Sequence, residues 1–269
     1  MIKYFFTDLD GTLLDDKGRL PKDFPKLLRD LKKAGRELVV ASGRQHPALL
    51  RLFKNYAKDM YFLAANGSLV AQGAKVLSYS PMPKAGLLAI VARLDSLPYV
   101  KCVLSGTKEQ YVRPEWKGKE KIFRYYEVSP KTVADFEAVD EDLTMLSIYD
   151  GMGDAAGRIL PCLTFAERNF TVTCSNQTWV DVAAKGVSKG AAIRSFLELM
   201  KSDKREAVAF GDYLNDLSMV GSVGRFYAVD NAHHDVKAVA TKVIGSNTAG
   251  GVVDAIYQLI EEDTDAKAE

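Results

Sequence analysis

Apolar runs and amphipathic stretches alternate along the first quarter of the chain. The apolar runs have the length of buried strands and occupy residues 2–7, 37–41 and 61–65. The stretch 24–34 has helical spacing and ends at Gly35, a residue type that often closes a helix, and a second helix is expected at 47–57. The pattern predicts a β-α-β-α-β unit with parallel strands.

The same alternation returns towards the C-terminus, with helices expected at 189–200 and 215–220 and strands at 207–210 and 226–229. The middle of the chain carries its own elements, namely a helix near 86–94 and strands at 100–104, 145–149, 170–174 and 179–182. We therefore expect an α/β protein with two domains. A Rossmann-like, doubly wound, mostly parallel core would comprise 1–81 and 186–269, and an inserted α/β cap domain would comprise 82–185. The polar tail after Glu262 is expected to fray.

Composition and charge narrow the classes of partner. The 36 Lys and Arg residues nearly balance the 35 Asp and Glu residues, so no global field favours nucleic acid or an anionic membrane. The run KGKEK before Phe123, Tyr125 and Tyr126 is interpreted as a solvated cap loop beside strand aromatics. No apolar run has the length of a membrane span or a signal peptide. A small molecule is the expected partner, with neither nucleic acid nor a membrane.

The three cysteines lie far apart and form no CxxC pair. This spacing argues against a disulfide framework or a zinc site, and it favours a reducing compartment. The three histidines, His46, His233 and His234, show no HxxH spacing, so surface or cap-loop roles are expected for them. We expect a cytoplasmic protein that is a monomer or a small homo-oligomer.

The sequence DLDGT at 8–12 directly follows an apolar strand. In parallel α/β sheets, ligands bind beyond the carboxyl ends of the strands. The carboxylates of Asp8 and Asp10 would repel each other there unless a cation lay nearby. Gly11 then permits a sharp turn out of the strand.

Three further segments carry candidate chemistry. Ser42 in ASGR stands at another strand end, where a hydroxyl and backbone amides can hold phosphate oxygens. Lys189 in KGVSKG opens a helix and offers a point charge for phosphate. In GDYLNDLSM, Asp212 and Asp216 are one helical turn apart with Asn215 between them, so three oxygen-bearing side chains can converge on a hard cation such as Mg²⁺.

Together these four segments resemble the haloacid dehalogenase (HAD) superfamily of phosphatases, most closely the Cof-type branch (subclass IIB). Members of that branch carry a large α/β cap between the second and third motifs. The motifs occur in the family's order and spacing, and the resemblance covers the whole chain, including Asn66-Gly67 and the late segment NTAGGVVDAI.

The resemblance implies a role for each matching residue. Asp8 would attack phosphorus, and Asp10 would protonate the leaving oxygen and then activate water. The phosphoryl group would be bound by Ser42, Lys189, Asn215 and the main-chain amides of Leu9 and Gly43. Mg²⁺ would be held by the Asp8 carboxylate, the Asp10 carbonyl and Asp212, with Asp216 in support. To act as an acid, Asp10 needs a pKa above about 3.9, whereas metal-bound Asp8 stays ionised.

One departure from the family pattern is visible. The branch often has Gly-Asn-Ala after its last core strand, and this chain has Asp230-Asn231-Ala232. The extra carboxylate of Asp230 is left without an assigned role. Arg44 is a candidate for substrate contact, and a surface ion pair is an equally good interpretation of it.

Each motif also has a purely structural interpretation. DLDGT occurs as an acidic turn, and paired aspartates often stand at a solvated helix start. Ser42 is a suitable N-cap, and Lys189 would then be a solvated surface side chain.

The motifs leave four candidate functions to compare. The first is a Mg²⁺-dependent hydrolase of small phosphomonoesters, and the resemblance suggests sugar phosphates. The second is a phosphotransferase or mutase with the same aspartyl phosphate, and the third is a non-catalytic sensor, which would not need both Asp8 and Asp10. A dinucleotide-dependent oxidoreductase is discounted because no GxGxxG follows the first strand.

Overall fold

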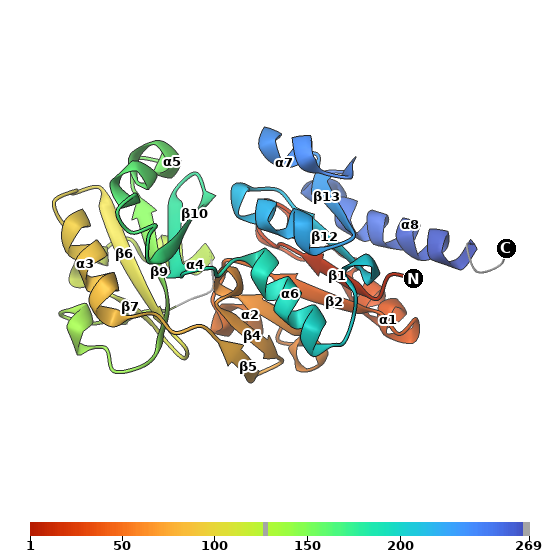
Figure 1. The fold of residues 1–269 in the computed structure, drawn as a ribbon, viewed down its shortest axis with the longest axis horizontal. Helices are drawn as coiled ribbons and strands as arrows, with labels where there is room; N and C mark the ends of the chain where they lie inside the picture. Colours follow the sequence, from red (N-terminus) through yellow and green to blue (C-terminus); the bar gives the residue numbers. More distant parts are fainter. Residues whose placement is uncertain (126–128, 266–269) are drawn as a thin grey trace. The chain divides into compact units, whose positions relative to one another are not determined.

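The structure is a computed structural model of the chain and describes residues 1–125 and 129–265. Figure 1 shows the elements. In chain order they are β1 (Tyr4–Thr7), α1 (Phe24–Lys33), β2 (Glu37–Ala41), α2 (His46–Leu52), η1 (Ala57–Asp59), β3 (Tyr61–Ala64), η2 (Ala65–Gly67), β4 (Leu69–Gln72), β5 (Lys75–Tyr79), α3 (Lys84–Leu94), β6 (Val100–Gly106), β7 (Gln110–Val112), η3 (Pro114–Trp116), α4 (Glu120–Tyr125), β8 (Lys131–Thr132), η4 (Phe136–Ala138), β9 (Leu143–Asp150), α5 (Ala155–Arg158), η5 (Leu160–Leu163), β10 (Phe170–Asn176), β11 (Trp179–Ala184), α6 (Lys189–Leu199), η6 (Lys204–Glu206), β12 (Ala207–Gly211), η7 (Leu214–Ser222), β13 (Arg225–Val229), α7 (His234–Val239), β14 (Lys242–Ile244), η8 (Asn247–Ala249) and α8 (Gly251–Asp265).

Two compact units divide the chain. The first comprises 1–42, 59–63 and 189–269, and the second comprises 43–58 and 64–188. The finer division predicted above, with 82–185 as an inserted cap, stays a prediction.

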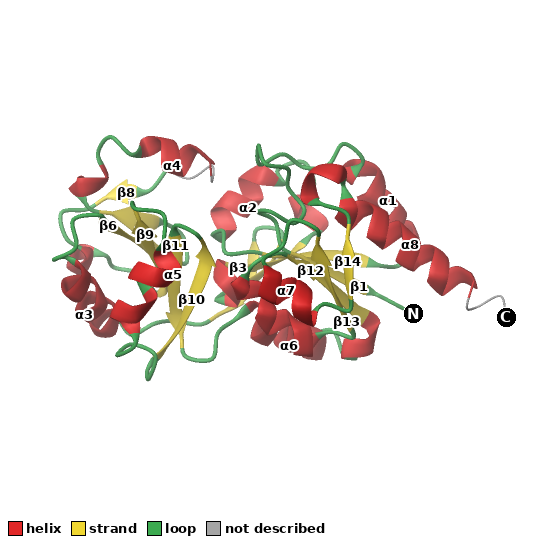
Figure 2. Ribbon diagram, turned by 90° about the horizontal axis from the view of Figure 1, so that it is seen from above, coloured by secondary structure: helices red, strands yellow, loops and turns green. Residues whose placement is uncertain are grey.

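A parallel sheet forms the centre of the first unit. Its strands lie in the order β14-β13-β12-β1-β2-β3, and every neighbouring pair runs parallel. β1 is therefore flanked by β12 and β2, which places the residues after these three strands at one edge of the sheet. Figure 2 shows α1 and α8 on one side of this sheet and α6 on the other.

Aromatic packing fixes α6 against the sheet. The ring of Phe196 makes edge contacts with Tyr4, Phe6 and Tyr61 at centroid distances of 5.4, 5.6 and 5.1 Å. Tyr4 and Phe6 are two residues apart on β1 and so face the same side of the sheet. Phe196 thus anchors α6 to this face of the sheet, and the first residue of the helix, Lys189, reaches Asp8 directly after β1.

A mostly antiparallel sheet dominates the second unit. Its strands lie in the order β10-β11-β9-β6-β7-β8. β4 and β5 pair with each other antiparallel and do not belong to this sheet. Trp116 stacks on Trp179 with ring centroids 6.1 Å apart and also contacts Phe123. The two units together confirm the predicted α/β class with a parallel core.

Most predicted elements are present, and three predictions were wrong. The second helix ends at Leu52 instead of extending to 57, because the chain turns at the buried Phe53. The tail does not fray directly after Glu262: α8 continues to Asp265, and Asp263 is held by the buried Arg36 at 2.9 Å. The run KGKEK is exposed at 117–119 and 121, as predicted, but its last residues, together with Phe123 and Tyr125, belong to the helix α4 and not to a strand. Phe123 is buried against Trp116, and Tyr126 lies outside the described residues.

Within the described part of the chain, the helices are all too short or too polar to span a membrane.

Candidate active site

Predicted site residues follow three neighbouring strands of the parallel sheet. Asp8 comes directly after β1, and its backbone N–H donates to the carbonyl of Phe210 on β12 at 3.0 Å. Asp212 comes directly after β12. Ser42 follows β2, is buried, and donates its backbone N–H to the carbonyl of Leu63 at 2.9 Å. The sheet thus gathers Asp8, Ser42 and Asp212 where parallel α/β proteins bind ligands.

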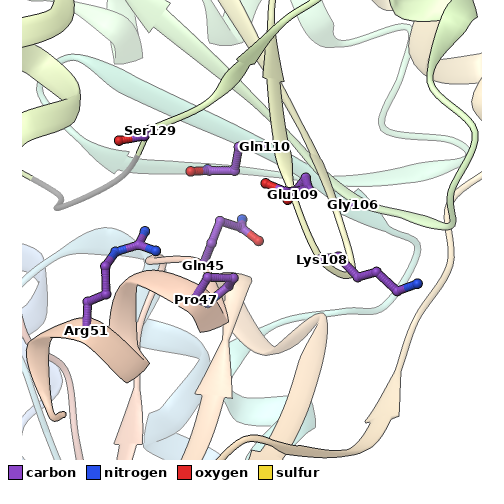
Figure 3. A pocket seen from close by; sticks show the side chains of 8 residues that line it. All are labelled: Gln45, Pro47, Arg51, Gly106, Lys108, Glu109, Gln110 and Ser129. Carbon is purple, nitrogen blue, oxygen red and sulfur yellow. The ribbon is translucent and has the colours of Figure 1, made fainter.

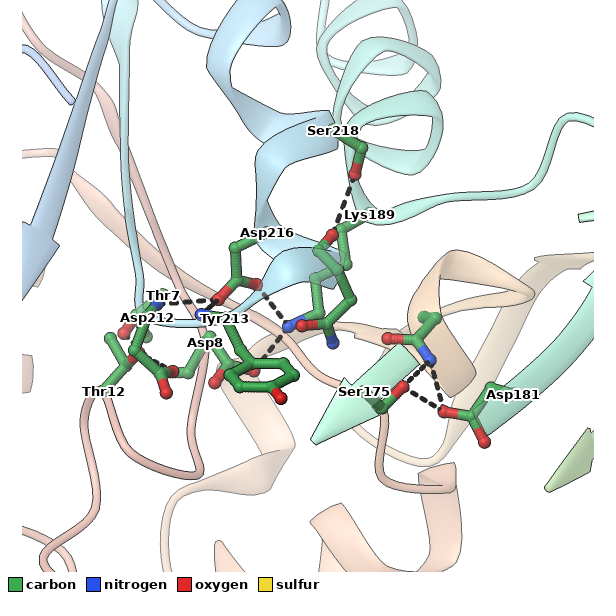
Figure 4. A network of polar contacts seen from close by, with 12 residues as sticks. Thr7, Asp8, Thr12, Ser175, Asp181, Lys189, Asp212, Tyr213, Asp216 and Ser218 are labelled. Carbon is green, nitrogen blue, oxygen red and sulfur yellow. Dashed lines mark hydrogen bonds and ion pairs between the residues drawn. The ribbon is translucent and has the colours of Figure 1, made fainter. Parts of the chain in front are cut away.

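A buried lysine links two of the carboxylates. Lys189 is 1% exposed, and its Nζ donates to Asp8 Oδ1 at 2.6 Å and to Asp216 Oδ1 at 2.7 Å. Figure 4 shows Lys189 between these two side chains. One carboxylate oxygen from each of Asp8, Asp212 and Asp216 lies within 4.8 Å of the others. The interpretations of Lys189 as a solvated side chain and of Asp216 as part of a solvated helix start are therefore wrong.

Asp216 shapes the loop that carries Asp212. Its Oδ2 accepts hydrogen bonds from the backbone N–H groups of Asp212 at 2.8 Å and Tyr213 at 3.1 Å, while Oδ1 is bound by Lys189. Asp216 is fully buried, so its charge is offset by these donors instead of water. Both oxygens of Asp216 are already used within the protein.

Thr12 orients Asp212. The Thr12 hydroxyl donates to Asp212 Oδ1 at 2.7 Å. Gly11 has a φ of +84°, and a Cβ at this position would collide with the Asp212 carboxylate. The turn after β1 therefore packs directly against Asp212. Neither Oδ2 of Asp8 nor Oδ2 of Asp212 accepts a hydrogen bond from the described residues.

The close approach of α6 to η7 completes the site. A Cβ at Gly190 would collide with the Ser218 carbonyl, and the Gly190 N–H donates to Ser218 Oγ at 3.1 Å. Ser218 Oγ in turn donates to the carbonyl of Asn215 at 3.1 Å. Only a residue without a side chain at 190 lets Lys189 enter the carboxylate cluster from this side.

Burial sets the proton affinities of the cluster. Burial raises the pKa of Asp8 to about 7, with further increases from Asp216 and Asp10, against the lowering effect of Lys189. Burial, Asp8 and Asp216 likewise raise the pKa of Asp212 well above 3.8. Burial alone would lower the pKa of Lys189, but the charges of Asp216 and Asp8 outweigh it and raise that pKa. One ammonium therefore faces more negative charge than it can neutralise.

The donor set fits a hard divalent cation. Carboxylate oxygens are the ligands that Mg²⁺ takes in proteins, and the three carboxylates supply the negative charge that such an ion needs. Asp8 and Asp212 each have an oxygen that could bind it, whereas Asp216 is occupied by Lys189 and two N–H groups. The geometry thus agrees with Asp216 as a supporting residue.

The metal-free protein is expected to lose stability as pH rises from about 4 to about 7 through Asp8. Folded Asp8 keeps its proton up to a pKa of about 7, compared with an ordinary pKa of 3.8. The folded state therefore binds more protons than the unfolded state in this window. The stabilisation that results is complete below the ordinary pKa and is lost as pH rises through the folded pKa. Asp212 acts in the same direction.

Thermal melts in EDTA of the unaltered chain and of Asp8→Asn measure this effect. The melting temperature of Asp8→Asn minus that of the unaltered chain should increase as pH rises. A difference between the two that does not change with pH would show that Asp8 is not desolvated in this way.

The remaining predicted residues lie at the same loops or in the second unit. Leu9 and Asn215 are buried next to Asp8 and Asp216, and Asp10 lies in the turn after β1, where its backbone bridges to Leu14. Gly43 and Arg44 belong to the second unit. Arg44 is buried, so its interpretation as a surface ion pair was wrong.

One of the three histidines differs from expectation, and Asp230 was left without an expected role. His46 is buried and its Nε2 lies 2.8 Å from the Gly73 carbonyl, so the surface role predicted for it was wrong. His233, His234 and Asp235 have ligand atoms within 4.8 Å of one another, a proximity that the HxxH criterion did not detect. Asp230 is exposed and lies 3.7 Å from the Lys237 ammonium.

A buried carboxylate in the second unit was missed by the sequence analysis. Asp181 on β11 accepts hydrogen bonds from Ser147 at 2.6 Å, Ser175 at 2.5 Å and the Asn66 amide at 2.7 Å. Figure 4 shows Ser175 pointing toward Asp181. The donors come from β9, β10 and η2, and Asn66 adopts a left-handed conformation with a φ of +53°. Only folding brings these four residues together. Asn66 stands in a segment that matches the family, but no local pattern predicts that it contacts Asp181.

A cavity of about 70 Å³ lies in the second unit, and Figure 3 shows its lining. It is formed by Gln45, Pro47, Arg51, Gly106, Lys108, Glu109, Gln110 and Ser129. Pockets for drug-sized ligands usually have volumes of about 300–1,000 Å³. The cavity is much smaller than such a pocket.

Comparisons with known proteins place the chain in a family. The haloacid dehalogenase-like hydrolase family matches residues 5–256. The chain is 28% identical to the 5-amino-6-(5-phospho-D-ribitylamino)uracil phosphatase YbjI of Escherichia coli, over 97% of this chain and 97% of that protein. It resembles the crystal structure of SMU.1108c from Streptococcus mutans with a TM-score of 0.89 and 25% identity, over 97% of this chain and 100% of that one.

A further solved structure, described as the HAD subclass IIB sugar phosphatase BT4131, shares the fold with a TM-score of 0.81 at 23% identity, over 96% of this chain and 98% of that one. The α/β fold and the carboxylate cluster at its strand ends agree with a hydrolase. Because the family model matches residues 5–256, this chain belongs to the haloacid dehalogenase-like hydrolase family. The resemblance identified from its motifs is confirmed.

Proposed function

We propose that this protein is a Mg²⁺-dependent phosphatase that hydrolyses small soluble phosphomonoesters through a phosphorylated Asp8. The observation that carries the proposal is the buried cluster in which Lys189 lies within hydrogen-bond distance of both Asp8 and Asp216, with Asp212 beside them. Membership of a hydrolase family whose relatives are named phosphatases supports the same conclusion.

In the first step the Asp8 carboxylate attacks phosphorus. A bond forms between an Asp8 oxygen and phosphorus, the bond to the ester oxygen breaks, and Asp10 gives its proton to that leaving oxygen. In the second step Asp10 takes a proton from water, the water oxygen bonds to phosphorus, and the Asp8–phosphorus bond breaks. Free phosphate leaves and both aspartates return to their starting states.

Charge is the main obstacle to the first step. At about 4 Å and an effective dielectric of about 20, a carboxylate and a phosphate dianion repel each other by roughly 8 kcal/mol. Lys189 offers a buried ammonium next to Asp8, where a low dielectric strengthens its effect. Mg²⁺, held by the Asp8 and Asp212 carboxylates and the Asp10 carbonyl, with Asp216 in support, would neutralise charge between nucleophile and phosphate.

The other predicted residues would bind the phosphoryl group. We propose that the Ser42 hydroxyl, the amides of Leu9 and Gly43, and Asn215 hold its oxygens, as phosphoryl transfer depends on positioning and electrostatic stabilisation. Arg44 is a further candidate for contact with the substrate. Residues 82–185 would serve as the cap, closing the site to bulk water and to macromolecules.

We propose that sugar phosphates or related polyol phosphates are the substrates. YbjI is named for a substrate with a phosphorylated ribityl chain, and BT4131 is described as a sugar phosphatase. Free cysteines, two of them buried, agree with a cytoplasmic location.

Activity is expected to require Mg²⁺ and to favour small phosphomonoesters. A panel of sugar phosphates, polyol phosphates and nucleotides, assayed with Mg²⁺ and with EDTA, measures both. Removal of metal should reduce turnover at least about 10²-fold, because charge neutralisation is lost. Full turnover in EDTA, or transfer of the phosphoryl group to a sugar hydroxyl instead of water, would contradict the proposed reaction.

A further inference from the structure

Two asparagines hold the turn that follows Asp8. Asn231 Nδ2 donates to the Gly11 carbonyl at 2.7 Å, and Asn247 Nδ2 donates to the Leu14 carbonyl at 2.9 Å and to Asp16 Oδ1 at 3.1 Å. The Asn247 backbone N–H donates to Asn231 Oδ1 at 3.0 Å. Asn231 and Asn247 thus form one continuous chain of hydrogen bonds, which we call the asparagine brace.

The brace connects distant parts of the first unit. Asn231 follows β13 and Asn247 begins η8 after β14, whereas the turn that they hold follows β1. Asn247 is 7% exposed, so water cannot easily replace its amide if the side chain is removed. None of the roles proposed above uses either residue.

The turn itself is a closed backbone structure around Asp10. The Thr12 and Leu14 N–H groups both donate to the Leu9 carbonyl, at 3.2 and 2.9 Å, and the backbone of Asp10 bridges to Leu14. Gly11, which directly follows Asp10, is held from outside by Asn231. The brace therefore holds this turn at the Gly11 carbonyl, one residue after Asp10, and again at the Leu14 carbonyl, on the residue whose backbone bridges to Asp10.

We propose that Asn231 and Asn247 are positioning residues for Asp10, and that the brace fixes its carboxyl group relative to the leaving oxygen. This inference rests on the proposed role of Asp10 as the general acid. A general acid acts from about 2.6–3.2 Å, and a displacement of about 1 Å can cost roughly 10²-fold in rate. Loosening the turn would therefore impair proton transfer more than attack by Asp8, whose backbone is held by β12.

Dependence on the leaving group separates proton transfer from general damage. An alkyl phosphate has a basic leaving oxygen and needs the proton from Asp10, whereas p-nitrophenolate leaves as a stable anion and needs it little. A displaced Asp10 should thus lower turnover of the alkyl phosphate selectively. A fold that is merely less stable lowers the active fraction and reduces both rates by the same factor.

The experiment compares kcat/KM for p-nitrophenyl phosphate and for the best alkyl phosphate of the panel. In Asn247→Ala and Asn231→Ala, the alkyl rate should fall at least about 10-fold more than the aryl rate. The double variant should lose less than the product of the two single losses, because the residues act as a unit. Thr248→Ala is the matched control, an exposed change in the same short η8 turn, and should leave the ratio unaltered.

Asn231 is exposed, so Asn231→Ala provides the test if Asn247→Ala fails to fold. Equal losses on the two substrates would overturn the positioning role and leave the proposed function standing. Turnover that survives Asp8→Asn unchanged would overturn the proposed function itself, and the inference with it.

Discussion

Asp8→Asn is expected to reduce phosphatase turnover at least about 10³-fold. The asparagine side chain has the same shape, but its amide is a poor nucleophile and offers no charge to the metal. Asp8 is 6% exposed and its Oδ1 is bound by Lys189 at 2.6 Å, so the geometry around position 8 should be preserved. Loss of activity would then report chemistry and not misfolding.

Melting temperature and a control variant accompany this measurement. Burial raises the pKa of Asp8 to about 7, which means that its charged form is unfavourable in the metal-free fold. Asp8→Asn should therefore melt no lower than the unaltered protein in EDTA near neutral pH. Asp254→Asn makes the same chemical change on the exposed face of α8 and should retain full activity. Substantial turnover in Asp8→Asn would exclude Asp8 as the nucleophile.

Lys189→Met is expected to impair both stability and activity. The side chain of Lys189 is 0% exposed and is bonded to Asp8 and Asp216, so its removal leaves two buried carboxylates without their counter-charge. Breaking a buried ion pair from one side typically costs about 3–5 kcal/mol in the free energy of unfolding. Loss of a cation next to the attacking group should also lower kcat at least about 10²-fold.

Denaturant unfolding in EDTA and in Mg²⁺ measures this prediction. Mg²⁺ should restore part of the stability of Lys189→Met, because it supplies positive charge to the same carboxylates. Lys33→Met removes an exposed lysine from the end of α1 and should change stability by less than about 1 kcal/mol. If Lys189→Met is too unstable to purify, Lys189→Arg provides the test. Arginine keeps the positive charge, but its planar guanidinium does not match the position of the compact ammonium, so activity should still be lost. Unfolding and turnover like those of the unaltered protein would contradict the role of the buried lysine.

The parts of the site that were predictable depend on local signals. Asp8, Ser42 and Asp212 each directly follow an apolar strand, and parallel strands present their carboxyl ends at one edge. The order β12-β1-β2 then makes these three residues neighbours. A strand pattern and a short motif are enough to predict that these three residues lie close together, because each consists of consecutive residues in the sequence.

The parts that were missed depend on contacts between distant residues. Asn231 and Asn247 are separated from Gly11 by more than two hundred positions, and only the packing of β13 and β14 beside β12 brings them to the turn. Asp181 similarly draws its donors from three separate elements. Asn231 and Asn247 stand in segments that match the family, but single polar residues have no periodicity, so the sequence pattern does not predict which distant residue each one contacts.

The end of the chain shows the same limit. Polar composition after Glu262 suggested fraying, but Asp263 accepts hydrogen bonds from Arg36 and from the Ile2 N–H at 2.7 Å. A buried arginine needs a partner, and the helix extends to supply one. Composition alone does not reveal which surface charge meets a buried one.

The most direct test of the account is to trap the phosphorylated enzyme during turnover of the best substrate. Reduction with borohydride converts an aspartyl phosphate to an alcohol, so residue 8 would become homoserine and the change would be located by mass spectrometry of the peptide that contains it. The account predicts this modification at Asp8 in the unaltered protein and none in Asp8→Asn. In Asp10→Ala it predicts more of the modification with p-nitrophenyl phosphate, whose leaving group needs little help from Asp10 while hydrolysis of the aspartyl phosphate still does. Modification at a different residue, or turnover with no modified residue at all, would contradict it.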